Sequence, residues 1–199
     1  MKFRSLLLGH RDENTAPRIV TTLDAMRPES RQSTVLSAEP AELAALWDIF
    51  DGQEVTAEHF VPADTPPMTE VIHEGKNSAP AFRRFQKRFC RPSQGSEVVW
   101  GYNHQPFQWA TGPAYFVGRP ANEGEPARFV FDYTALPERV PAGWPAIVPS
   151  SVRLGRFIFA GMHDYVRRIS EHVCIGRVYR DGKNEDTWFV LCRLTKPTA

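Results

Sequence analysis

The stretch HVCIGRVYRDGKNEDTWFVLCRL, residues 172–194, consists of two apolar runs separated by a polar turn. The runs 172–180 and 187–194 are rich in Val, Ile, Phe, Tyr and Trp, which favour strands. The turn DGKNED carries the Asp, Gly and Asn residues that reverse the chain in hairpins. The stretch therefore predicts two antiparallel strands. Gly176, in the middle of the first run, predicts a bulge or the close approach of another group.

Four upstream runs have a similar composition: EVVWGYNHQ (97–105), GPAYFVGR (112–119), ARFVFDYTAL (127–136) and GRFIFAGM (155–162). Short turns separate most of them, a longer proline-punctuated crossing precedes the last, and no crossover helix intervenes. Six consecutive strands of this kind indicate an antiparallel meander, which at this length tends to close into a barrel or wrap around a helix. The expected fold class is α+β and mostly β: an antiparallel barrel or strongly curved meander of six or more strands.

One helix is indicated upstream of the strands, in SAEPAELAALWDIFDG, residues 37–52. Leu43, Leu46, Trp47 and Phe50 fall at positions i, i+3, i+4 and i+7, which places them in one apolar stripe. A helix with such a stripe packs on another element. We therefore expect one or two N-terminal helices packed on the sheet.

The remaining segments give weaker patterns. Residues 1–35 show no sustained period, so we expect a loosely ordered N-terminal arm with one short strand at 18–23. Residues 36–199 would then form a single β-barrel-like domain. Within it, the proline-rich stretch 61–80 is expected to be a long loop. The phenylalanine spacing in APAFRRFQKRF, residues 79–89, predicts an amphipathic helix with a basic face.

Composition limits the classes of partner. The chain has 199 residues and a formal net charge of +1, so nothing suggests nucleic acid or a membrane as a partner. The N-terminal apolar run is too short for a signal peptide, and no apolar stretch approaches the ~20 residues that cross a bilayer. Three cysteines without a CxxC spacing are typical of reduced, buried thiols. We expect a soluble, cytoplasmic protein, and we leave a homodimer open.

Motifs that would hold a cofactor are absent from the sequence. It contains no GxGxxG, P-loop or GxSxG sequence, and its six histidines show neither an H-x-x-x-H nor an HExxH spacing. We therefore expect no nucleotide cofactor, no serine-hydrolase triad and no metal. Any chemistry would come from the protein's own side chains.

The C-terminal run 155–194 resembles the last part of the uncharacterised proteins named after an N-terminal GXWXG motif. AELAALWDIFDGQEVTAEHF (41–60) and FQKRF (85–89) are similar to that family's first helix and its W-x-G-K-R-F stretch. The GXWXG motif itself is absent, since the equivalent span reads VPADTPP (61–67), and only Lys87–Phe89 match in the second stretch. Over residues 36–195, the resemblance implies a lipocalin-like barrel without an assigned activity.

The strand 97–105 places aromatic and polar side chains on its two faces. Alternation puts Trp100, Tyr102 and His104 on one face and Asn103 on the other. Two aromatic residues followed by a histidine are typical of the wall of a polar-bottomed pocket. They are equally typical of a strand end that emerges into solvent, and both readings stay open.

Asp132 alternates along its strand with Phe129, Phe131 and Tyr133. If the phenylalanines pack under the N-terminal helix, Asp132 points into the barrel, where burial or a neighbouring arginine would shift its pKa. It could then serve as a general base or orient a histidine. If the phenylalanines face the interior, Asp132 is a solvated surface residue.

The polar stretch that begins at His163 also has two interpretations. His163 and Arg167, like Asp164 and Arg168, are spaced i, i+4, which favours one or two turns of a solvent-facing helix. The same residues could instead form a catalytic cluster. His172 differs from them, because it begins the next predicted strand and its ring would reach the mouth of the barrel.

These residues suggest a barrel that acts on a small apolar or aromatic molecule without a cofactor, as a lyase or isomerase carrying out dehydration, isomerisation or cyclisation. The alternatives are a carrier or sensor of a hydrophobic ligand and, third, a partner-binding module. The candidate catalytic residues are His104, Asp132, His172 and Tyr102. The candidate substrate-binding residues are Trp100, Asn103, Trp109, Tyr115, Tyr133, Met162, His163 and Arg177.

Overall fold

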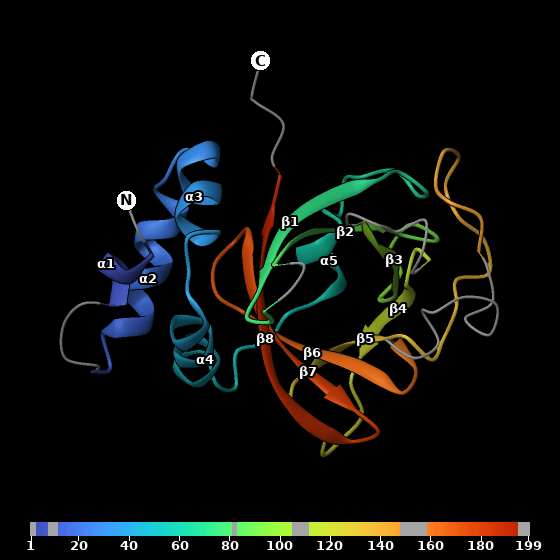
Figure 1. The fold of residues 1–199 in the computed structure, drawn as a ribbon. Coiled ribbons are helices and arrows are strands. Elements are labelled where there is room, and N and C mark those ends of the chain that lie inside the picture. The colour runs from blue at the N-terminus through green and yellow to red at the C-terminus, as the bar shows by residue number, and fades with distance from the viewer. Residues whose placement is uncertain (1–2, 8–11, 81–82, 105–111, 148–158, 195–199) are drawn as a thin grey trace.

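In the computed structural model of the chain, the described residues are 3–7, 12–80, 83–104, 112–147 and 159–194. Eight antiparallel strands form a closed barrel in the order of the sequence (Figure 1). The strands are β1 (Val71–Asn77), β2 (Arg84–Cys90), β3 (Val99–His104), β4 (Tyr115–Pro120), β5 (Phe129–Asp132), β6 (Met162–Arg168), β7 (Val173–Arg180) and β8 (Lys183–Arg193). The predicted mostly-β barrel is thus confirmed.

The barrel closes where the first strand pairs with the last. β1 and β8 run antiparallel, with His73 opposite Arg193 at one end of the ladder and Asn77 opposite Phe189 at the other. Closure leaves the sheet without a free edge, which removes the main route to edge-to-edge association. Closure also gives every strand one face toward the interior.

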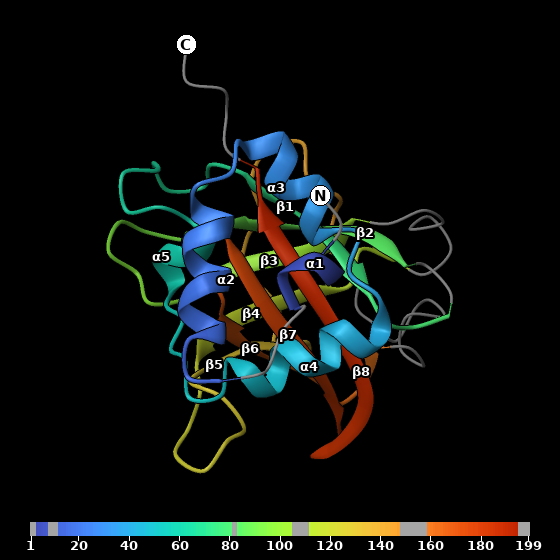
Figure 2. The same ribbon diagram turned by 90° about the vertical axis from the view of Figure 1, so that its left-hand side faces the viewer.

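In the described residues, five helices accompany the barrel, and four of them lie together on its outside. They are α1 (Arg4–Leu7), α2 (Thr15–Asp24), α3 (Pro28–Val35), α4 (Pro40–Ile49) and α5 (Ala57–Phe60). Figure 2 shows α1–α4 in front of the strands, over β7 and β8, whereas α5 lies at one end of the barrel. No helix among these is long and apolar enough to cross a membrane.

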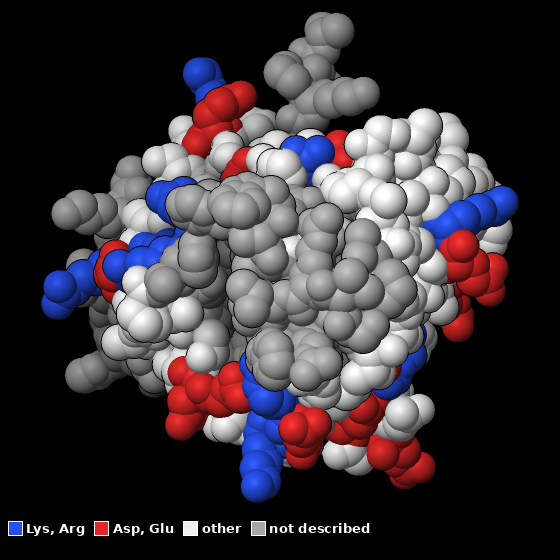
Figure 3. Space-filling view, turned by 45° about the vertical axis from the view of Figure 1, so that its right-hand side comes forward, with Lys and Arg blue, Asp and Glu red and all other residues white. Residues whose placement is uncertain are grey.

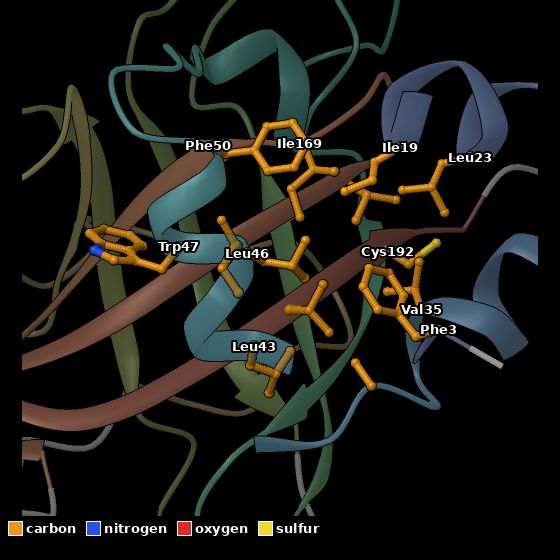
Figure 4. Packing of buried hydrophobic residues seen from close by; sticks show 14 of the residues in the cluster. Phe3, Ile19, Leu23, Val35, Leu43, Leu46, Trp47, Phe50, Ile169 and Cys192 are labelled. Carbon is orange, nitrogen blue, oxygen red and sulfur yellow. The ribbon is translucent and has the colours of Figure 1, made fainter. Parts of the chain in front are cut away.

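The outer helices and the barrel wall share one apolar core. The predicted stripe Leu43, Leu46, Trp47 and Phe50 is buried on α4 (Figure 4), as expected for a helix packed on a sheet. The other members of this core come from α1–α3 and from the outward-facing positions of β5–β8: Phe3, Ile19, Leu23, Val35, Ala38, Val130, Tyr165, Ile169, Val173, Ile175, Val190 and Cys192.

A second core fills part of the barrel interior, mostly with phenylalanine rings. Phe60 of α5 packs against Phe89, Phe129 and Phe131, with ring centroids 5.0–5.2 Å apart for the three pairs. α5 therefore closes this end of the barrel with an aromatic plug. The phenylalanines of β5 face inward, which decides between the two orientations left open for that strand.

Several inward-facing glycines, among them Gly101 and Gly176, lie directly beneath aromatic rings. A Cβ at Gly101 would lie 2.4 Å from Cζ of Phe116, and a Cβ at Gly176 would lie 2.1 Å from Cζ of Phe189. Both contacts are far too close for a larger residue, so the rings occupy the space that a side chain would need. The close approach predicted at Gly176 is confirmed.

Four local predictions are wrong. The strand expected over 155–162 is not found in residues 159–161, which lie directly before β6, and residues 155–158 lie outside the described residues. Residues 79–89 contain β2 rather than a helix. The phenylalanine spacing does not distinguish the two, because Phe85 and Phe89 share a face in a strand as well as in a helix. Residues 163–170 lie mainly in β6, since Met162, Asp164 and Val166 alternate with outward-facing neighbours. The proline-rich stretch 61–80 contains β1.

The N-terminal prediction is also corrected. The segment 18–23 lies in α2, not in a strand, and its Ile19 and Leu23 are fully buried. Residues 1–35 therefore contribute packed helices where they are described, instead of a loose arm. The sequence hid this because each helix is short and only one face of each is apolar.

Candidate functional site

Four polar side chains meet inside the barrel, and together they form what we call the interior polar cluster: Lys87, Asn103, Tyr133 and Asp164. Strand alternation places each of them among inward-facing apolar residues. Lys87 lies on β2, Asn103 on β3, Tyr133 directly after β5 and Asp164 on β6. All four are buried, with Lys87 only 1% exposed and Asp164 only 3%. Buried charges are uncommon unless they are paired, so this cluster is the first candidate for function.

The centre of the cluster is an ion pair. Nζ of Lys87 lies 3.0 Å from Oδ2 of Asp164. Asn103 accepts a second hydrogen bond from Nζ at 2.8 Å, and the hydroxyl of Tyr133 accepts a third. The three protons of an ammonium group therefore each have an acceptor.

Tyr133 joins the members of the cluster to one another. Its hydroxyl lies 3.0 Å from Oδ2 of Asp164, to which it can donate, and Nδ2 of Asn103 donates to the hydroxyl at 3.1 Å. Each of these contacts is within normal hydrogen-bond distance. The network fixes the orientation of the Asp164 carboxylate in the interior.

Aromatic rings surround the Lys87 ammonium group. Nζ lies 4.9 Å from the ring centroid of Phe116, 5.2 Å from that of Phe131 and 5.1 Å from those of Tyr133 and Phe189. These distances suit cation–π attraction, which partly replaces lost hydration. The walls around the charged pair are therefore apolar and aromatic.

Burial lowers the pKa of the cation in the cluster and raises the pKa of the phenol. Loss of hydration lowers the pKa of Lys87 below its usual value, although the charge and hydrogen bond of Asp164 act against this. Burial and the neighbouring Asp164 charge raise the pKa of Tyr133 well above its ordinary value. At neutral pH Tyr133 is therefore a neutral hydrogen-bond donor.

One oxygen of the cluster has no hydrogen-bond partner among the described residues. Oδ2 of Asp164 receives hydrogen bonds from Lys87 and Tyr133, but Oδ1 is buried without any. An unpaired buried carboxylate oxygen is costly, and such groups call for a bound donor. Oδ1 is thus the position at which a hydroxyl, an amine or another donor would bind.

The structure separates the predicted site residues into two groups. Asn103, Tyr133 and Met162 face the interior, where Met162 belongs to the apolar core. The others that are described lie on the outer wall of the barrel or in a loop: Trp100, Tyr102, His104, Tyr115, Asp132, His163, His172 and Arg177. Trp109 lies outside the described residues. The prediction that these side chains converge in the interior is therefore wrong for most of them.

Asp132 lies on the outer face of β5 because its phenylalanine neighbours face inward, but it is largely buried there, with 8% exposure. It pairs with Arg119 (3.3 Å) and His163 (3.4 Å) and accepts hydrogen bonds from Thr134. Burial acts to raise the pKa of Asp132, but the Thr134 hydrogen bonds and the two basic neighbours outweigh it and lower the pKa. Such a carboxylate is a weak base and a poor candidate for proton abstraction.

The predicted aromatic wall also lies outside the barrel. Tyr102 packs against Tyr115 and Trp144, with centroid distances of 5.4 and 4.8 Å. The hydroxyl of Tyr115 donates to the carbonyl of Pro145. These rings attach the loop after β5 to the wall, which is a structural role.

The remaining polar candidates stabilise strands and turns. His172 lies in the loop between β6 and β7, and its Nδ1 accepts a hydrogen bond from Arg193 of β8 at 2.8 Å. Arg177 pairs with Asp186 at 3.0 Å across the β7–β8 hairpin. On the face shown in Figure 3, charges of both signs are mixed along the edges formed by described residues.

Sequence reasoning missed Lys87 as a site residue and named Asp164 only within the polar stretch that begins at His163, not among the candidate site residues. Both lie in stretches interpreted as helices with charged surfaces. Period-2 counting would have found them, because Lys87 falls between Phe85 and Phe89 on one face of a strand. A charge flanked at i±2 by aromatic residues is the signal of a polar group in an apolar interior.

Among the described residues, no group of three or more His, Cys, Asp or Glu side chains could hold a metal ion. The comparisons with known proteins give no relative: no family model matches the chain, and neither the curated proteins nor the solved structures contain a significant match.

Proposed function

We propose that the barrel binds a small apolar or aromatic molecule in its interior and performs acid–base chemistry on it without a cofactor. The reaction class would be a dehydration, an isomerisation or a cyclisation. Asp164 would act as the base through Oδ1. The observation that supports this is a buried carboxylate with one oxygen unpaired, held by Lys87 and Tyr133 within aromatic walls.

The other cluster members would assist this step. Lys87 neutralises the carboxylate and Tyr133 fixes its orientation, so Oδ1 is positioned before a substrate arrives. When Asp164 takes a proton, the Lys87 ammonium remains next to the negative charge that develops on the substrate. General acid–base assistance of this kind typically contributes about 10²–10⁴-fold.

A carrier of a hydrophobic ligand is the second candidate. All three protons of the Lys87 ammonium group are already engaged inside the cluster. An ammonium group with all its protons hydrogen-bonded stabilises the fold but is a poor proton donor, which favours a carrier over a catalyst. In a carrier, Asp164 Oδ1 would simply accept a hydrogen bond from the ligand.

The resemblance to the GXWXG-type proteins is compatible with either candidate. Lys87, the centre of the cluster, is one of the three residues that match in the FQKRF stretch. We propose on this basis that Lys87 is part of what the two share.

The test for catalysis uses 5-nitrobenzisoxazole, a neutral aromatic probe of buried bases. A base removes the proton from its carbon, the ring N–O bond breaks, and the product is a coloured phenolate. We expect turnover by the protein and a loss of about 100-fold or more in Asp164→Asn. Asp132→Asn removes a carboxylate from the outer wall and is the matched control, with activity retained.

The test for binding uses the fluorescence of N-phenyl-1-naphthylamine, an apolar aromatic amine with one N–H donor. Binding that weakens in Asp164→Asn but not in Asp132→Asn, without turnover of the first probe, would support the carrier. Neither binding nor turnover would contradict both candidates. Circular dichroism and urea unfolding establish that each variant is folded.

A further inference from the structure

Another buried cation lies just beyond the C-terminal end of β2. Arg91 directly follows the strand and is 2% exposed. No carboxylate of the described residues forms an ion pair with it, in contrast to buried Lys87. A buried charge without a counter-ion is strongly unfavourable, because its hydration is lost and nothing replaces it.

The guanidinium group of Arg91 is also short of hydrogen-bond acceptors. Nη2 donates to the carbonyl of Val61, but Nε is buried without any partner. Arginine binds carboxylates with two parallel N–H donors held in one plane. The fork of Arg91 therefore has donor capacity that the described part of the chain leaves unused.

Arg91 lines a hollow of about 460 Å³ between α5, the β2–β3 turn and the β4–β5 turn. Val55, Ala57 and Phe129 provide apolar surface, and each is buried. Pockets for small molecules commonly have volumes of about 300–1,000 Å³ and combine apolar walls with a few polar groups. This hollow has the size and the lining of such a pocket.

Charges of both signs occur on its rim. Glu54 and Arg128 lie 3.6 Å apart with both side chains mostly exposed, and Glu58 and Glu97 are exposed as well. Solvent and salt screen these rim charges, whereas Arg91 lies where screening is weak. The buried arginine therefore determines which ligand charge is favoured inside.

The hollow is separate from the interior polar cluster. Arg91 lies four residues after Lys87 along the chain. At the rise per residue of a β-strand, this places the two residues about 13 Å apart. Phe89 lies between them along the strand, and its ring packs against the plug ring Phe60 at a centroid distance of 5.1 Å. A ligand in the hollow would thus not touch Asp164.

We propose that this hollow binds a small organic monocarboxylate, whose carboxylate contacts Arg91 and whose apolar body lies against Val55, Ala57 and Phe129. Recognition would rest on the unpaired donors of Arg91. The proposal is independent of the chemistry assigned to the interior polar cluster.

The experiment compares two probes of similar shape by isothermal titration calorimetry: 4-phenylbutyrate and 4-phenyl-1-butanol. We expect the carboxylate to bind at least about tenfold more tightly than the alcohol, because hydrogen bonds to a charged group are stronger than those to a neutral hydroxyl. Arg91→Met should remove this preference. Arg84→Met, which removes an exposed arginine at the other end of β2, should keep it.

Two further variants keep the proposal falsifiable if Arg91→Met does not fold. Glu97→Gln removes a negative charge from the rim and should tighten carboxylate binding. Asp164→Asn should leave it unchanged. Equal affinity for acid and alcohol, no binding of either, or carboxylate binding that depends on Asp164 would each overturn the proposal.

Discussion

Lys87 and Asp164 form an ion pair between strands on opposite sides of the barrel. β2 and β6 are four strands apart in either direction around the eight-stranded ring, and the two side chains meet at 3.0 Å across the interior. No backbone ladder joins these strands. The pair therefore links the two halves of the wall through the core.

The first prediction concerns the stability of this link. Lys87→Met leaves the Asp164 carboxylate buried without its partner, so we expect the free energy of unfolding to fall by about 3–5 kcal/mol. The double variant Lys87→Met/Asp164→Leu removes both charges and should be more stable than Lys87→Met alone. Urea unfolding of the single and double variants measures the coupling.

An exposed pair provides the comparison for this cycle. Arg180 and Glu185 lie 2.8 Å apart with partly exposed side chains. Arg180→Met should cost less than about 1 kcal/mol, as surface pairs usually do. Equal costs for the two single variants would show that the interior pair is not buried as described.

The second prediction concerns the contact between Gly176 and Phe189. Gly176→Ala places a methyl group where the ring of Phe189 now lies, and we expect destabilisation of about 1–3 kcal/mol from overpacking. Phe189→Leu should relieve the clash, so the double variant should be more stable than the sum of the two single effects predicts. Thermal unfolding of the three variants tests this, and strict additivity would contradict it.

The third prediction concerns pH. His73 is fully buried, Nε2 lies 3.0 Å from the carbonyl of Phe60, and Nδ1 has no partner in the part of the chain that the structure describes. Burial lowers the pKa of His73 to about 3, although the hydrogen bond with Phe60 acts against this. Between about pH 6.5 and 3 the unfolded chain therefore binds a proton that the folded protein does not, so stability falls as the pH falls.

For His73 alone the expected loss is about 1.4 kcal/mol per pH unit once the pH is well below 6.5. Urea unfolding between pH 7.5 and 5 avoids the range where most carboxylates titrate. His73→Gln keeps a donor for the Phe60 carbonyl and removes the titration, so its pH dependence should be weaker. His104→Gln changes an exposed histidine and serves as the control; equal slopes for both variants would contradict the assignment.

Strands with uniform apolar composition could be predicted from the sequence, and strands with interior charges could not. β3, β4, β5, β7 and β8 were recognised from aromatic and β-branched residues between turn signals. β2 and β6 were interpreted as helices, because the phenylalanines of 79–89 and the charge pairs of 163–168 have helical spacing, so Lys87 and Asp164 were counted among the charged residues of a solvent-facing surface. These two strands are the ones that carry the ion pair of the candidate site.

Which face of each strand points into the barrel depends on barrel closure, and closure cannot be predicted from a local sequence pattern. Asp132 and Phe131 are neighbours, and the sequence allowed either to face inward. Closure of β1 onto β8 and the plug ring Phe60 put the phenylalanine inside. The interior position that one of the two orientations would have given Asp132 is occupied by Asp164 on the neighbouring strand.

The outer helices cover strands from the far end of the polypeptide. α3 and α4 pack on β7 and β8, and β1 obtains its second neighbour from β8. A ribosome makes the helices first and their partners last, so Leu43 and Leu46 remain uncovered during most of translation. The nascent chain therefore exposes this apolar surface until β7 and β8 have been made, and barrel closure depends on contacts between distant segments, which form slowly.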